Sequence, residues 1–134
     1  MISLDLITLN GDRALNNVGI LRNNETGELY FSPCFDNGDA LLSLEDYDSY
    51  SEEEFDYVDE DVMICTFGVS DNQDYIDLIQ NNGGPFLEIN KEALLEDLKN
   101  YSNDLYDRSL VERNKKLIEF RLNKFEGIIY KNVS

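Results

Sequence analysis

The chain has 134 residues, of which 42% are hydrophobic and 29% charged, a composition typical of one folded domain spanning residues 1–134. Its 28 acidic residues outnumber the 11 basic ones, so the net charge is −17. This charge excludes direct binding to DNA, RNA or an anionic membrane, because phosphate groups are bound through Lys and Arg.

The N-terminal third predicts a β-hairpin. Residues 2–9 are apolar enough for a strand or for the end of a buried helix. Residues 17–22 and 28–35 are two short apolar runs separated by the turn sequence Asn-Asn-Glu-Thr-Gly at 23–27. We therefore expect a hairpin over residues 17–36.

The C-terminal part predicts helices. Residues 63–69 form an apolar strand or a buried connection, and residues 71–80 have helical spacing that ends at Asn-Gly-Gly-Pro. Asn90 is a good N-cap for a helix whose apolar positions are Leu94, Leu98, Tyr101 and Leu105. A last long helix places on one face Val111, Ile118, Leu122, Phe125 and Ile129. The expected fold class is α+β, with a short hairpin and a mainly helical C-terminal part.

Several kinds of chemistry are excluded by residue type. The chain has no His, so a Ser-His or Cys-His nucleophile pair cannot form. The two cysteines, Cys34 and Cys65, have no metal-ligand spacing, which argues against a structural zinc site. The chain has no apolar run of membrane-spanning length and no basic signal-peptide start. We expect a reduced, cytoplasmic protein of a bacterial host.

One stretch has the residue order of a phosphoryl-transfer site. Phosphoryl transfer of the protein-kinase type uses an Asp near the attacking hydroxyl, an Asn five residues on, and a later Asp that holds Mg²⁺. Asp12, Asn17 and Asp36 have this order, with the predicted hairpin between Asn17 and Asp36.

The sequence around these residues resembles the catalytic segment of HipA-like serine/threonine kinases. That segment runs Asp-Arg-His-x-x-Asn, a hairpin, then Pro-x-Phe-Asp-x-Gly, and the match covers about residues 2–42. The resemblance implies that Asp12 is the catalytic base, that Asn17 and Asp36 are the metal ligands, and that the helices belong to the large lobe of a kinase.

The chain departs from that family in two respects. Ala14 stands where the family has His, and no Gly-rich phosphate loop is present. The first Lys is Lys91, and the chain begins about ten residues before the loop, so we expect no ATP-binding lobe within it. We therefore expect no catalysis and no cofactor for this chain alone, and treat Asp12, Asn17 and Asp36 as vestigial candidates. The alternative is that these polar residues only hold turns and cap strands.

The acidic residues are concentrated in one region. Residues 23–90 contain 18 carboxylates and no Lys or Arg, and ten of the carboxylates lie between residues 45 and 61. Such a block is usually a solvated segment, but here it is interleaved with aromatic residues that can anchor it to a core. The candidate partner-binding residues are Glu45, Asp46, Asp48, Glu52, Glu53, Glu54, Asp56, Asp59, Glu60 and Asp61, extended by Asp71, Asp74 and Asp77.

These features give one leading hypothesis and two alternatives. The leading one is a non-catalytic binding protein that inhibits a nucleic-acid-handling enzyme, because a field of one sign can imitate phosphate charge. In size and composition the chain resembles the acidic nucleic-acid mimics that phages use against restriction or CRISPR nucleases, and its partner would be a basic nucleic-acid-binding protein or nuclease. The first alternative is the catalytic half of a split HipA-like kinase, which would use Mg-ATP together with a separate ATP-binding lobe. The second is an inert remnant or a toxin-neutralising decoy of such a kinase.

Overall fold

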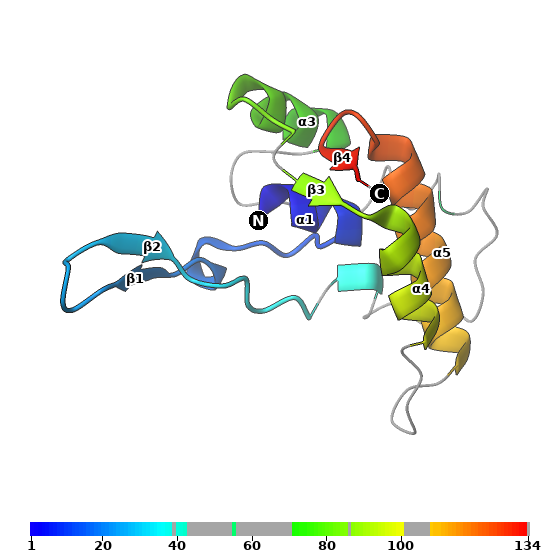
Figure 1. Ribbon diagram of the computed structural model, residues 1–134, viewed down its shortest axis with the longest axis horizontal. Helices are drawn as coiled ribbons and strands as arrows, with labels where there is room; N and C mark the ends of the chain where they lie inside the picture. The colour runs from blue at the N-terminus through cyan, green and yellow to red at the C-terminus, as the bar shows by residue number, and fades with distance from the viewer. Residues whose placement is uncertain (39, 43–54, 56–70, 86, 101–107, 134) are drawn as a thin grey trace.

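In the part of the chain that the structure describes, a short N-terminal helix and three further helices form the body, and a hairpin projects from it (Figure 1). The computed structural model describes residues 1–38, 40–42, 55, 71–85, 87–100 and 108–133. The helices are α1 (Ile2–Thr8), α3 (Asn72–Asn81), α4 (Lys91–Asn100) and α5 (Arg108–Phe125), and short 3₁₀ turns lie at η1 (Leu15–Asn17) and η2 (Ala40–Leu42). Two antiparallel strands and two parallel strands complete the described part, so the fold is α+β.

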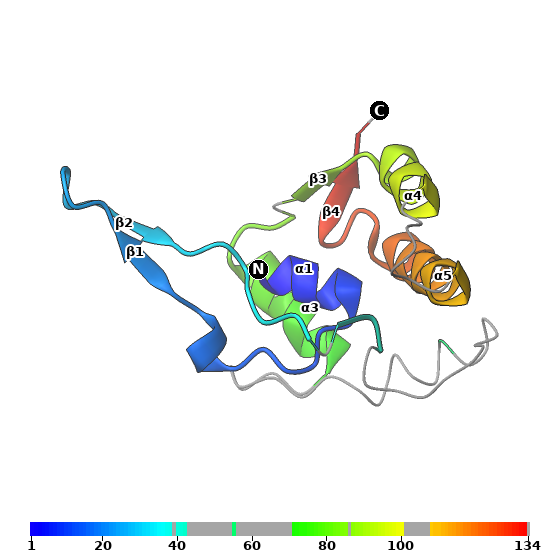
Figure 2. The same cartoon turned by 90° about the horizontal axis from the view of Figure 1, so that it is seen from below.

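The sequence allowed either a strand or a helix for the apolar residues 2–9. The structure has helix α1 there. It ends at Leu9, whose backbone has the left-handed angles φ 52° and ψ 50° and whose N–H donates to the carbonyl of Asp5. Leu6 and Ile7 are buried, and α1 packs against α3 and α5. The helix is therefore a central element of the core (Figure 2).

The predicted hairpin is confirmed, in strands β1 (Ile20–Arg22) and β2 (Leu29–Phe31). They pair antiparallel, with Ile20 opposite Phe31 and Arg22 opposite Leu29. In the turn, the side chain of Asn23 accepts hydrogen bonds from two backbone N–H groups, and Gly27 supplies a positive φ of 77°. Every residue of both strands is exposed, and the hairpin extends away from the helices in both views (Figures 1 and 2).

A second small sheet joins two distant parts of the chain. β3 (Leu87–Ile89) pairs in parallel with β4 (Tyr130–Asn132), with Leu87 opposite Tyr130. The pair connects the segment before α4 to the segment after α5, and α4 packs on α5. The sequence did not predict either strand.

The start of α4 agrees with the prediction, and the end of α5 does not. Asn90 is the expected cap of α4, because its side chain accepts a hydrogen bond from the N–H of Ala93 at 2.8 Å. The prediction that Ile129 continues the face of the last helix was wrong. Helix α5 ends at Phe125, Gly127 then takes a positive φ of 75°, and Ile129 is buried from the following turn.

The core lies between α1, α3 and α5. Its fully buried apolar side chains are Leu6, Ile7, Leu9, Phe55, Tyr75, Ile79, Leu117, Ile118, Leu122, Phe125, Ile129 and Tyr130. Helix α4 has no fully buried residue; its predicted apolar positions Leu94 and Leu98 are half-buried against this core. The predicted segment 63–69, and the positions Tyr101 and Leu105, lie outside the described residues.

The core also encloses a cation. Arg121 on α5 is completely buried; its Nε donates to the carbonyl of Leu6 at 2.6 Å, and its guanidinium lies 5.1 Å from the centre of the Phe125 ring. Burial lowers the pKa of Arg121 to about 9. The charge persists at neutral pH, and the carbonyl and the ring compensate part of its desolvation. Among the described helices, none combines the length and the apolar character that crossing a bilayer requires.

Candidate functional site

A buried ion pair joins α1 to the loop that follows it. Asp5 and Arg13 are each about 1% exposed, and the guanidinium binds the carboxylate with both ends: Nε to Oδ2 at 3.0 Å and Nη2 to Oδ1 at 2.7 Å. The hydrogen bond to Asp5 raises the pKa of Arg13 above its ordinary value, although burial acts in the opposite direction. This two-point pair fixes the direction of the loop from residue 10 to residue 17.

Arg13 also holds the segment that carries Asp36. Its Nη1 donates to the backbone oxygen of Phe35 at 2.7 Å, and its Nη2 donates to the side-chain oxygen of Asn37 at 2.6 Å. Asp36 thus lies between two residues bound by one guanidinium. Its own φ is 56°, a left-handed angle that Asp tolerates better than most residues do. The loop with Asp12 and the loop with Asp36 are therefore fastened to each other through Arg13, the neighbour of Asp12.

Asn17 completes the arrangement from the 3₁₀ turn η1. Its side-chain nitrogen donates to the backbone oxygen of Asp12 at 3.2 Å, five residues before it, and Asn17 is only 5% exposed. Because the amide nitrogen of Asn17 points toward the Asp12 carbonyl, its amide oxygen Oδ1 points away from that carbonyl. The carboxylates of Asp12 and Asp36 are exposed. A buried amide and two exposed carboxylates thus come from two loops that Arg13 joins.

This set of groups fits a divalent cation only in the presence of a further ligand. Within the described residues no group of three or more carboxylates, cysteines or histidines converges. Asn17 and Asp36 offer two oxygen-bearing side chains. Mg²⁺ is commonly held by one or two carboxylates together with water and substrate phosphates. By residue type alone, a cation at this place would need further ligands, such as the oxygens of a phosphate.

The other predicted site residues divide into two groups. The acidic run from Glu45 to Asp61 lies outside the described residues. Asp71, Asp74 and Asp77 are exposed at the start of α3. Asp71 is the N-cap of that helix and accepts a hydrogen bond from the N–H of Asp74 at 2.9 Å, so part of its role is structural.

Sequence reasoning missed the residues that hold the site together. Asp5 and Asn10 were not singled out, and Asn10 donates to the Asp5 carboxylate at 2.9 Å. Two signals were available: Asp5 is the single charge within the apolar residues 2–9, and Arg13 is one of only two basic residues before Lys91. A lone carboxylate in an apolar stretch requires a cation if it is buried.

A cavity of about 560 Å³ lies beside this site, between α1, the base of the hairpin, α3 and β3. Its walls are mostly apolar and include Ile2, Val18, Phe31, Ile79 and Leu87, together with Asn17. Its volume is within the range of ligand pockets and of pockets that receive several side chains.

Comparison with known proteins gives no family or function for this chain. The chain matches no protein-family model, no curated protein and no solved structure. The resemblance to HipA-like kinases therefore stays a prediction from the residues of the two loops.

Proposed function

We propose that this chain supplies the catalytic loop of a HipA-like serine/threonine kinase, and that the ATP-binding lobe comes from polypeptide outside these 134 residues. One observation carries the proposal. The Asn17 side chain is bonded to the Asp12 carbonyl while Arg13 binds on both sides of Asp36, so the three residues of the kinase order are held by one network. Arg13 thus joins the two loops to each other, in addition to the local hydrogen bond that holds Asn17.

Each residue then has a distinct role. The exposed carboxylate of Asp12 accepts the proton of a serine or threonine hydroxyl. The Oδ1 atom of Asn17 and the carboxylate of Asp36 would hold the cation that accompanies ATP, and Arg13 is a positioning residue for both loops. When bound, Mg-ATP supplies the phosphoryl group and the cation neutralises its charge. The proposal places the protein in the cytoplasm, where ATP is available.

The experiment is a phosphate-transfer assay on the tagged chain isolated with its bound partners from its source cells. We expect transfer of labelled phosphate from Mg-ATP to protein with the wild type. The Asp12→Asn variant should lower it at least about 100-fold, the lower end for loss of a general base. The matched control is Asp97→Asn, which changes an exposed residue of α4 and should leave transfer unchanged. Equal transfer by wild type and Asp12→Asn would contradict the assignment.

A second candidate function is favoured by the charge distribution. Residues 23–90 carry 18 carboxylates and no basic residue, and the three carboxylates at the start of α3 are exposed. Under this candidate the chain inhibits a basic nucleic-acid-handling enzyme without catalysis, and the surface that contacts the enzyme includes residues 45–61. Changing Glu52, Glu53 and Glu54 to Lys should then abolish capture of such an enzyme, and capture of the wild type should fall steeply with salt. Undiminished capture by the triple variant would exclude this candidate.

A further inference from the structure

The hairpin exposes a group of large apolar side chains. Between residues 15 and 35, seven large apolar side chains are between 43% and 78% exposed. They are Leu15, Ile20, Leu21, Leu29, Tyr30, Phe31 and Phe35. Because side chains alternate between the two faces of a strand, the pairing of Ile20 with Phe31 and of Arg22 with Leu29 places Ile20, Leu29 and Phe31 on one face of the hairpin. Leu21 and Tyr30 lie on the other face.

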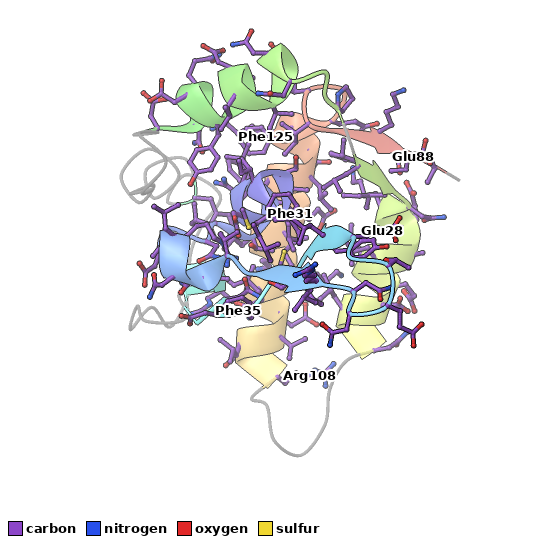
Figure 3. The ribbon with its side chains drawn as sticks, turned by 90° about the vertical axis from the view of Figure 1, so that its left-hand side faces the viewer. Glu28, Phe31, Phe35, Glu88, Arg108 and Phe125 are labelled. Atoms are coloured by element: carbon purple, nitrogen blue, oxygen red, sulfur yellow. The ribbon has the colours of Figure 1, made fainter. Side chains whose placement is uncertain are left out.

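Packing within the described residues does not account for this surface. The sheet has two strands, both of whose faces are exposed, and a two-stranded hairpin alone is only marginally stable in water. Figure 3 views the molecule from the side on which the hairpin projects, with Glu28, Phe31 and Phe35 labelled around it. The surface continues into the 560 Å³ cavity, because Phe31 belongs to both and Pro33 and Val18 line the cavity at the base of the hairpin.

The charges around this surface indicate what kind of partner fits it. Asp12 and Asp36 are exposed at the base of the hairpin and Glu25 is exposed at its tip, whereas Glu28 accepts a hydrogen bond from Tyr30 on the face opposite to Leu29 and Phe31. Arg22, the only basic residue between residues 14 and 90, is the cross-strand partner of Leu29, and its guanidinium lies near Gly27 in the turn. An apolar centre with an acidic rim is complementary to an apolar face with a rim of Lys and Arg. A second copy of this chain is a poor match, since it brings the same acidic rim and a net charge of −17.

We infer that the hairpin and the adjoining cavity form a docking surface for a basic amphipathic helix of another protein. The apolar face of the helix lies against Leu29 and Phe31 and places side chains in the cavity, and its Lys and Arg flanks face the acidic rim. This mode of binding, an amphipathic helix in an apolar groove, needs side chains spaced one helical turn apart. The inference is independent of phosphate transfer and makes no use of it.

The test uses a fluorescently labelled, 14-residue Leu/Lys amphipathic peptide and measures its anisotropy with the full chain. We expect saturable binding, and we expect Phe31→Ser with Leu29→Ser to weaken it at least about 10-fold. Both side chains are exposed, at 78% and 66%, so the variant should keep the fold, which circular dichroism verifies. Val133→Ser, a 36% exposed apolar residue after β4, is the matched control and should bind as the wild type does.

Two results would overturn the inference. If the hairpin variant and the wild type bind the peptide equally, only the acidic charge attracts it and the apolar surface plays no part. If the wild type is a dimer by light scattering and Phe31→Ser with Leu29→Ser makes it monomeric, the surface is occupied by a second copy instead. Either failure leaves the phosphate-transfer proposal standing, because the hairpin variant leaves Asp12, Asn17 and Asp36 in place.

Discussion

Replacing Asp5 by Asn should destabilise the protein more than the same change at an exposed carboxylate of the described residues. The substitution leaves the Arg13 guanidinium about 1% exposed without its counter-charge. It also places an amide nitrogen against a guanidinium donor or against the donor nitrogen of Asn10. Removing one partner of a buried ion pair typically costs about 3–5 kcal/mol. The expected stability of a chain of this length is about 10 kcal/mol, so the variant loses a third to a half of it.

Urea denaturation followed by circular dichroism measures this loss. With a slope of about 2 kcal/mol per molar urea, the midpoint of the Asp5→Asn variant should fall by about 1.5–2.5 M. The exposed Asp97 provides the control, and Asp97→Asn should shift the midpoint by no more than about 0.3 M, the equivalent of about 0.5 kcal/mol. If Asp5→Asn and Asp97→Asn unfold at the same midpoint, the two loops are not held by the ion pair and the reasoning about the site is refuted.

Three further predictions concern the core, the close contact between Gly84 and Ile79, and the hairpin. Leu122→Ala removes a fully buried side chain and should lower the free energy of unfolding by about 2–5 kcal/mol in the same urea assay; a loss below 1 kcal/mol would place Leu122 outside the core. Gly84→Ala puts a methyl group 2.3 Å from Cγ2 and 3.0 Å from the backbone oxygen of Ile79, so it should cost about 1–3 kcal/mol; an unchanged urea midpoint would show that the approach is not this close. The hydrogen bond from Tyr30 lowers the pKa of Glu28. That bond therefore contributes stability above the ordinary pKa of Glu, and this stability is lost as the pH falls through the lowered pKa. An NMR titration should place the titration midpoint of Glu28 at a higher pH in Tyr30→Phe than in the wild type. Equal midpoints would mean that the bond does not form.

Local signals in the sequence were sufficient to predict the hairpin and the start of α4. Asn23 and Gly27 are turn residues whose side chain and positive φ act within a few residues, and Asn90 caps the helix that follows it directly. Such interactions depend on sequence neighbours, so a single sequence contains them. For the same reason the helical period predicted α5, although it could not show that Gly127 stops the helix before Ile129.

Interactions between distant residues could not be predicted in this way. Strands β3 and β4 have three residues each and pair across about 40 residues, so neither strand carries enough alternating residues to be recognised. The exposure of the hairpin was not predictable either, because hydrophobicity alone does not distinguish a buried strand from an exposed one. The partner of Asp5 was equally hidden, since nothing in the order of residues states which cation reaches a buried carboxylate.

The measurement that tests the central claim most directly is an NMR titration of this chain with Mn²⁺ and ADP. If Asn17 and Asp36 hold a cation that arrives with a phosphate, amide signals of residues 12–17 and 35–38 should lose intensity at the lowest Mn²⁺ concentrations. The Asp36→Asn variant should keep these signals while signals of other acidic residues still broaden. If the signals of residues 12–17 and 35–38 keep their intensity in the wild type while acidic residues elsewhere broaden, the assignment of Asn17 and Asp36 as cation ligands of this chain is contradicted.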